Sequence, residues 1–147
     1  MKVYLVPQEY IKNIYPDIDK YVDRLVPTSH GRFDKIDLLN DILSGKASLW
    51  TIVDEDDDNK INGIIFTEIT IYPRTKMLSI SYAAADRLNE WMKESLVTLE
   101  NWAVDNGCNS MEVTGRRGWV KKLDLHNWHE EFVIVRKDNL KKDNLRI

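Results

Sequence analysis

Four side chains of this sequence are candidates for proton transfer near neutral pH. His30 lies in the polar segment from Thr28 to Arg32, and an imidazole titrates close to neutrality. Glu68 and Tyr82 lie in apolar, β-branched segments, where a carboxylate can accept a proton and a phenol can donate one. Each also has a structural interpretation, because loop histidines are usually just exposed and strands place alternate residues on a polar face. We take Glu68 as the candidate base, with Glu112 next, Tyr82 as the candidate acid and His30 as a candidate relay.

Anion binding is a second kind of chemistry, and it centres on the segment Tyr82-Ala83-Ala84-Ala85-Asp86-Arg87-Leu88-Asn89. A long helical pattern follows, so the amides of residues 84 to 89 and the helix dipole would favour an anion. The Arg87 guanidinium can pair with a phosphate. Asp86 opposes this, because as an N-cap it would occupy the same amides and repel a phosphate. The segment has no glycine, so its backbone cannot approach phosphates as closely as a glycine-rich loop.

One dense basic cluster is formed by Arg116, Arg117, Lys121 and Lys122, with Trp119 among them. Such a cluster can hold a phosphate group, or a nucleic-acid backbone with the indole stacked on a base. The alternative is a solvated basic helix face, and we favour it. The sequence gives no strong signal for nucleic-acid binding.

No metal site is expected. Asp54, Asp56 and Asp58 alternate as the first three ligands of an EF-hand loop do, but the sixth and twelfth positions lack the required glycine and glutamate. We interpret residues 54 to 60 as a charged hairpin tip. The single cysteine, Cys108, excludes an internal disulfide, and no cysteine or histidine pair has the spacing of a zinc site.

Composition indicates one domain. The chain has 147 residues, of which 43% are hydrophobic, and this is enough for one core and too little for two. The net charge of -3 comes from interspersed residues, so a nucleic-acid or membrane surface is not implied. No apolar run reaches membrane-spanning length. We expect a single domain at residues 1–136, a charged tail at 137–147, and a cytoplasmic protein.

Hydrophobic periodicity predicts the elements that must position these residues. We expect two short helices broken near Pro16, and the three central strands are expected to form an antiparallel meander. Further helices are predicted at 33–43, 87–106 and 116–123. Strands are predicted at 2–6, 48–53, 61–72, 76–83, 110–114 and 131–136.

The order of these elements resembles the GNAT acyltransferases over almost the whole chain. Gly63-Ile64-Ile65-Phe66 resembles the start of the family's third strand, and residues 87–106 resemble the helix below the cofactor. Asn127-Trp128 followed by Phe132-Val133-Ile134 resembles its last strand, and residues 111–119 resemble GNAT-like proteins of tailed bacteriophages. The resemblance implies an α/β (α+β) fold: a GNAT-like mixed, mostly antiparallel central sheet of about six strands, flanked by helices on both faces.

The same resemblance implies acetyl-CoA as a cofactor. Its pyrophosphate would lie at the turn before the long helix, and its pantetheine arm would enter the splay between strands 76–83 and 110–114. The family's tyrosine acid in the short helix before the last strand has no match here. The implied cofactor-binding residues are Ser81, Tyr82, Ala83, Ala84, Arg87, Leu88, Asn89 and Trp119.

Two functions follow from this comparison. The first is an acyl-CoA-dependent N-acetyltransferase acting on a small amine or a protein amine, with Glu68 or a water as base and amides near Ser81 and Tyr82 polarising the carbonyl. The second is a catalytically inactive GNAT-fold binding protein or phage virion-associated protein, which the missing glycines favour. A macromolecular partner would then bind at Arg116, Arg117 and Trp119, in the host cytoplasm or the virion.

Overall fold

The chain forms two compact units, Met1–Thr114 and Gly115–Ile147. The structure, a computed structural model, describes residues 1–115, 118–124 and 126–142. The first unit contains a sheet and three α-helices, and the second contains α4 (Gly118–Asp124). None of the helices in the described ranges is long and apolar enough to cross a membrane.

Five strands form the sheet in the order of the sequence. The first four pair in antiparallel fashion, and the fifth is parallel to the fourth. A parallel pair requires a long crossover connection, which is supplied here by α3 (Leu88–Asp105). The mixed, mostly antiparallel sheet predicted from the sequence is therefore confirmed. Its strands are β1 (Lys2–Leu5), β2 (Ser48–Asp54), β3 (Lys60–Ile71), β4 (Lys76–Ala85) and β5 (Ser110–Val113).

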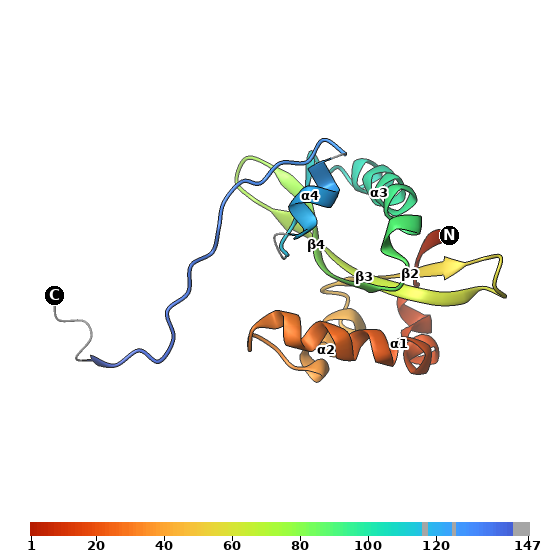
Figure 1. The fold of residues 1–147 in the computed structure, drawn as a ribbon, viewed down its shortest axis with the longest axis horizontal. Helices are drawn as coiled ribbons and strands as arrows, with labels where there is room; N and C mark the ends of the chain where they lie inside the picture. Colours follow the sequence, from red (N-terminus) through yellow and green to blue (C-terminus); the bar gives the residue numbers. More distant parts are fainter. Residues whose placement is uncertain (116–117, 125, 143–147) are drawn as a thin grey trace. The chain divides into compact units, whose positions relative to one another are not determined.

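Helices cover both faces of the sheet, as predicted. Figure 1 shows α1 (Ile11–Leu25) and α2 (Lys35–Leu43) on one face and α3 on the other. Short 3-10 turns at Gln8–Tyr10 and Val26–Ser29 flank α1. The core between α1, α2 and the sheet buries apolar side chains, among them Ile18, Tyr21, Val22, Leu25, Leu38, Ile42, Leu49, Ile64 and Phe66.

The predicted break at Pro16 is wrong, because α1 continues through this residue. Proline has no N–H, so the helix loses one backbone hydrogen bond there. Ile11 before the proline and Ile18 and Val22 after it are all buried on the same side of α1. Burial of this stripe outweighs the lost hydrogen bond, so the helix is not interrupted.

The strand predicted at residues 131–136 is also wrong, and within the described residues the sheet has five strands rather than about six. These residues have no regular secondary structure, and Phe132 and Val135 are 75% and 91% exposed. Their β-branched composition suits a pleated, half-buried surface. A strand also needs a hydrogen-bonded neighbour, and in the described part of the chain this segment pairs with none.

Candidate functional site

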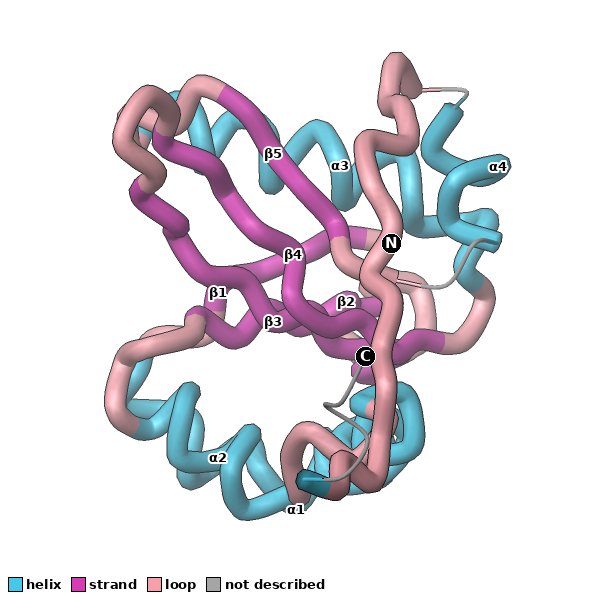
Figure 2. The backbone as a smooth tube through the Cα atoms, turned by 90° about the vertical axis from the view of Figure 1, so that its left-hand side faces the viewer, coloured by secondary structure: helices cyan, strands magenta, loops and turns pink. Residues whose placement is uncertain are grey.

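Strand β4 lies between β3 and β5, and its two pairings differ in length (Figure 2). The pairing with β3 extends to Gly63 opposite Ala85, whereas the pairing with β5 ends at Ile80 opposite Val113. Among the described residues, positions 81 to 85 therefore have no strand on the β5 side. Backbone amides and carbonyls along such an edge can bind an extended amide chain. This is where the resemblance places the pantetheine arm.

A β-bulge at Ser81 interrupts β4 at the start of this edge. Phe66 pairs with Tyr82 and Thr67 pairs with Ile80, so Ser81 has no partner residue on β3. An extra residue shifts the alternation of side chains and re-aims them. The bulge thus changes which side chains of β4 point toward α1 and α2.

Side chains on both sides of the bulge lie on one face. Phe66 and Thr70 occupy even positions of β3 and share the face covered by α1 and α2. The Tyr82 ring lies 6.0 Å from the Phe66 ring, and the Ser79 hydroxyl lies 2.7 Å from the Thr70 hydroxyl. Tyr82 and Ser79 therefore share this face, although they are three residues apart.

Tyr82 sits at the border between the apolar and polar parts of this face. Its ring packs edge-on against Phe33, with 4.7 Å between centroids. Burial raises the pKa of Tyr82, the charges of Glu68 and Asp41 raise it further, and Arg32 lowers it. The hydroxyl stays protonated at neutral pH, so it can donate a proton but cannot act as a base.

Beyond Tyr82, hydroxyl and carboxylate groups form a polar cluster on three strands. Glu112 Oε1 accepts hydrogen bonds from the Tyr72 hydroxyl at 2.8 Å and from Ser79 Oγ at 2.7 Å. Thr70 Oγ1 lies 2.7 Å from the same Ser79 Oγ. Glu68 on β3 and Glu112 on β5 both pair with Ser79 on β4, so two carboxylates flank one serine across the sheet.

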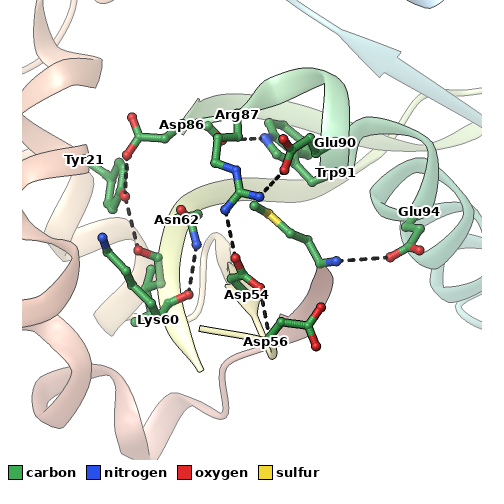
Figure 3. Close-up of polar contacts among 12 residues, drawn as sticks. Tyr21, Asp54, Asp56, Lys60, Asn62, Asp86, Arg87, Glu90, Trp91 and Glu94 are labelled. Atoms are coloured by element: carbon green, nitrogen blue, oxygen red, sulfur yellow. Dashed lines mark hydrogen bonds and ion pairs between the residues drawn. The ribbon is translucent and has the colours of Figure 1, made fainter. Parts of the chain in front are cut away.

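Asp86 is not the N-cap of α3, which corrects the interpretation of the sequence. Its carboxylate instead accepts a hydrogen bond from Tyr21 at 3.0 Å (Figure 3) and another from Arg24 Nη1 at 2.9 Å, and both donors lie on α1. Burial alone would raise the pKa of Asp86, but the hydrogen bonds from Arg24 and Tyr21 outweigh it and lower the pKa. Burial, followed by the hydrogen bond to Asp86, raises the pKa of Tyr21 to about 12. The Asp86 carboxylate therefore points away from the amides that begin α3.

The N-cap of α3 is Arg87, in the left-handed conformation with φ 56° and ψ 43°. Figure 3 shows its guanidinium between two carboxylates, Asp54 at 2.8 Å and Glu90. The hydrogen bond from Arg87 lowers the pKa of Asp54. No side chain in the described ranges caps this end of α3, so the first helical amides, those of Leu88 and Asn89, are available to solvent or to a ligand.

The remaining candidates differ in their surroundings. His30 is exposed and left-handed, with φ 53°, at the end of the 3-10 turn after α1. The Ala84 side chain is buried in the core, so only its backbone can face a ligand. Trp119 belongs to α4 in the second unit, where a Cβ added at Gly115 would lie 3.0 Å from its Cδ1. Arg116 and Arg117 lie outside the described residues.

The structure thus brings Glu68 within electrostatic range of Tyr82 and adds residues that we did not predict. Tyr72 is the clearest omission, although it lies four positions after Glu68 and strand alternation places both on one face. No sequence pattern indicates the roles of Arg24 and Tyr21, because they contact Asp86 from a helix more than sixty residues earlier in the chain. Within the described ranges, no group of acidic, histidine and cysteine side chains could hold a metal ion.

No family model and no curated protein matches the sequence, but solved structures match the fold. One described as a probable acetyltransferase has a TM-score of 0.68 and 11% identity, covering 95% of this chain and 100% of that one. A predicted acetyltransferase with acetyl-CoA from Clostridium acetobutylicum has a TM-score of 0.65 and 10% identity, covering 93% of this chain and 95% of that one. An aminoglycoside acetyltransferase from an uncultured soil metagenomic sample, in complex with sisomicin, has a TM-score of 0.62 and 15% identity. The match covers 95% of this chain and 96% of that one. The chain therefore shares the fold of these structures, a GNAT-like α+β fold.

Proposed function

We propose that this chain, whose fold is that of acetyltransferases, transfers an acetyl group from acetyl-CoA to a primary amine. The observation that carries the proposal is the end of β4. Its free edge at residues 81 to 85 leads directly into the uncapped start of α3. A strand edge suits the amide groups of a pantetheine arm, and a helix start suits a pyrophosphate. The free strand edge and the helix start are consecutive in the chain, so one extended ligand can contact both.

The backbone at the start of α3 has a conformation that can bind a pyrophosphate. A left-handed residue normally calls for glycine, but Arg87 takes this conformation, so the turn forms without one. Asp86 is directed to α1 and leaves the amides of Leu88 and Asn89 open. These two amides would hold the phosphates, and the backbone at residues 81 to 83 would hold the arm. The nearby carboxylate of Glu90 lowers the affinity that the amides alone would give.

The side chains around the β4 edge supply proton transfers. Acetyl-CoA, when bound, supplies a thioester whose carbonyl carbon an amine can attack. Backbone amides near Ser81 and Tyr82 donate to the charge that develops on the carbonyl oxygen. The protonated Tyr82 hydroxyl donates its proton to the leaving sulfur. A carboxylate of the same sheet face, for which Glu68 is the sequence-based candidate, accepts the proton of the amine.

A transfer assay tests this proposal. The purified chain is incubated with acetyl-CoA and a panel of diamines, an aminoglycoside and a lysine peptide, and acetylated products are measured by mass spectrometry together with released thiol. We expect product with at least one amine, and a loss of about 100-fold in rate in Tyr82→Phe. Tyr10→Phe is the matched control, because Tyr10 is an exposed tyrosine before α1. No thiol release with any amine, together with no binding of acetyl-CoA, would contradict the proposal.

A second proposal is a GNAT-fold binding protein without transferase activity. It is supported by the two carboxylates that hold the Arg87 guanidinium, because they compete with a phosphate for the same cation. The exposed apolar side chains at residues 132–135 suit a macromolecular partner. A folded protein that neither binds acetyl-CoA nor releases its thiol would favour this second function.

A further inference from the structure

We infer that Glu112, rather than Glu68, takes the proton from the acceptor amine, with Tyr72 and Ser79 as its positioning residues. This inference rests on the proposed function and assigns the base role to the second sequence-based candidate instead of the first. Both hydroxyls donate to the same oxygen, Oε1, at 2.8 and 2.7 Å. Among the described residues, none donates a hydrogen bond to Oε2. One oxygen is thus anchored and the other is open.

Anchoring distinguishes Glu112 from Glu68. In the described part of the chain, the one interaction of the Glu68 carboxylate is the effect of its charge on Tyr82. A side chain without a fixed partner samples several rotamers, whereas proton transfer is efficient only from a defined position. The charge of Glu68 therefore only adds to the burial that raises the pKa of Tyr82, while Glu112 is held ready to accept a proton.

The place of Glu112 in the sheet supports the same assignment. It precedes Val113, the last residue of β5 that pairs with β4. Its partner Ser79 lies two residues before the bulge at Ser81, a separation of about 7 Å along the strand. Glu112 therefore lies at the mouth of the free edge, where the thioester is proposed to bind.

The proton balance is closed by groups on this face. As the amine nitrogen forms a bond to the carbonyl carbon, the carbon–sulfur bond breaks. The proton of the nitrogen goes to Glu112 Oε2, and the sulfur receives the proton of the Tyr82 hydroxyl. Water then returns a proton to Tyr82 and removes one from Glu112, so both regain their starting states.

Steady-state kinetics with the best amine of the panel test the assignment. We expect Glu112→Gln to lower kcat by about 100-fold, and Glu68→Gln to lower it less than about tenfold. Tyr72→Phe and Ser79→Ala should each lower kcat several-fold with KM and the thermal midpoint unchanged, a split that a purely structural role would not give. Formate should restore part of the activity of Glu112→Ala. A loss in Glu68→Gln as large as that in Glu112→Gln would overturn the inference.

A titration without acyl donor separates this inference from the proposed function. Amide NMR shifts are followed while 1,4-diaminobutane is added to the free protein. We expect saturable shifts at Ser79, Glu112 and Val113 that are lost in Glu112→Gln and kept in the control Glu100→Gln on α3. Shifts confined to other residues, or none, would overturn the role of Glu112. Failure of acetyl-CoA to bind would count against the transferase alone.

Discussion

Replacing Arg87 by glycine should stabilise the protein relative to replacing it by alanine. Arg87 has φ 56° and ψ 43°, where a residue with a Cβ is less stable than glycine by about 1–2 kcal/mol. Glycine also loses more conformational entropy on folding than alanine, and this reduces its advantage by about 0.5–1 kcal/mol. Arg87→Gly should therefore be more stable than Arg87→Ala by about 1 kcal/mol. Both variants lose the contacts with Asp54 and Glu90, so these contacts cancel in the comparison.

Urea unfolding followed by tryptophan fluorescence measures the difference. The matched control is the pair Glu100→Gly and Glu100→Ala at an exposed position inside α3. There the order should reverse, with glycine about 1 kcal/mol less stable than alanine. If alanine at position 87 were as stable as glycine or more stable, the left-handed turn would be refuted.

Three further perturbations probe the fold and the contacts of Asp86 with α1. A Cβ at Gly63 would lie 2.3 Å from the Ala85 Cβ, so Gly63→Ala should destabilise by about 1–3 kcal/mol in urea unfolding, and Ala85→Gly should restore part of the loss. Thr67→Val removes the acceptor of the buried Trp50 Nε1, which should cost about 1–3 kcal/mol in the same assay. Because its folded pKa is lowered from 3.8, Asp86 adds stability that is complete above about pH 4 and disappears as pH falls through the lowered value. In unfolding experiments, the advantage of the parent over Asp86→Asn should thus be under about 1 kcal/mol at neutral pH and should shrink steadily as the pH is lowered below about 4.

Much of the fold was predictable, because the elements with strong periodicity formed as expected. The predictions of strands at 48–53 and 61–72 and of a long helix at 87–106 are confirmed to within two residues. Local rules failed where tertiary contacts decide. Pro16 predicts a break, but the apolar residues buried on both sides of it keep α1 continuous. Residues 131–136 have strand composition, but no pairing partner in the described part of the chain.

The candidate site was harder to predict from the sequence, because its contacts join segments that are far apart in the chain. Tyr72 and Glu112 are 40 residues apart, and their contact depends on the register of three strands. Asp86 was expected to cap α3 because it immediately precedes the helix. Its actual partners are 62 and 65 residues away on α1, and no local pattern reports them. Without glycine, the backbone of this turn is expected to stay farther from phosphates, but no sequence pattern indicates that Arg87 itself adopts the left-handed conformation.

Isothermal titration with acetyl-CoA tests the central proposal most directly, using a charge placed at the start of α3. Asn89 and Asn101 are both exposed on this helix and about 18 Å apart, beyond the screening length of about 8 Å at physiological salt. We expect saturable binding that Asn89→Asp weakens at least several-fold, while Asn101→Asp leaves it unchanged. Absence of heat at millimolar acetyl-CoA, or equal effects of the two variants, would contradict a pyrophosphate site at this turn.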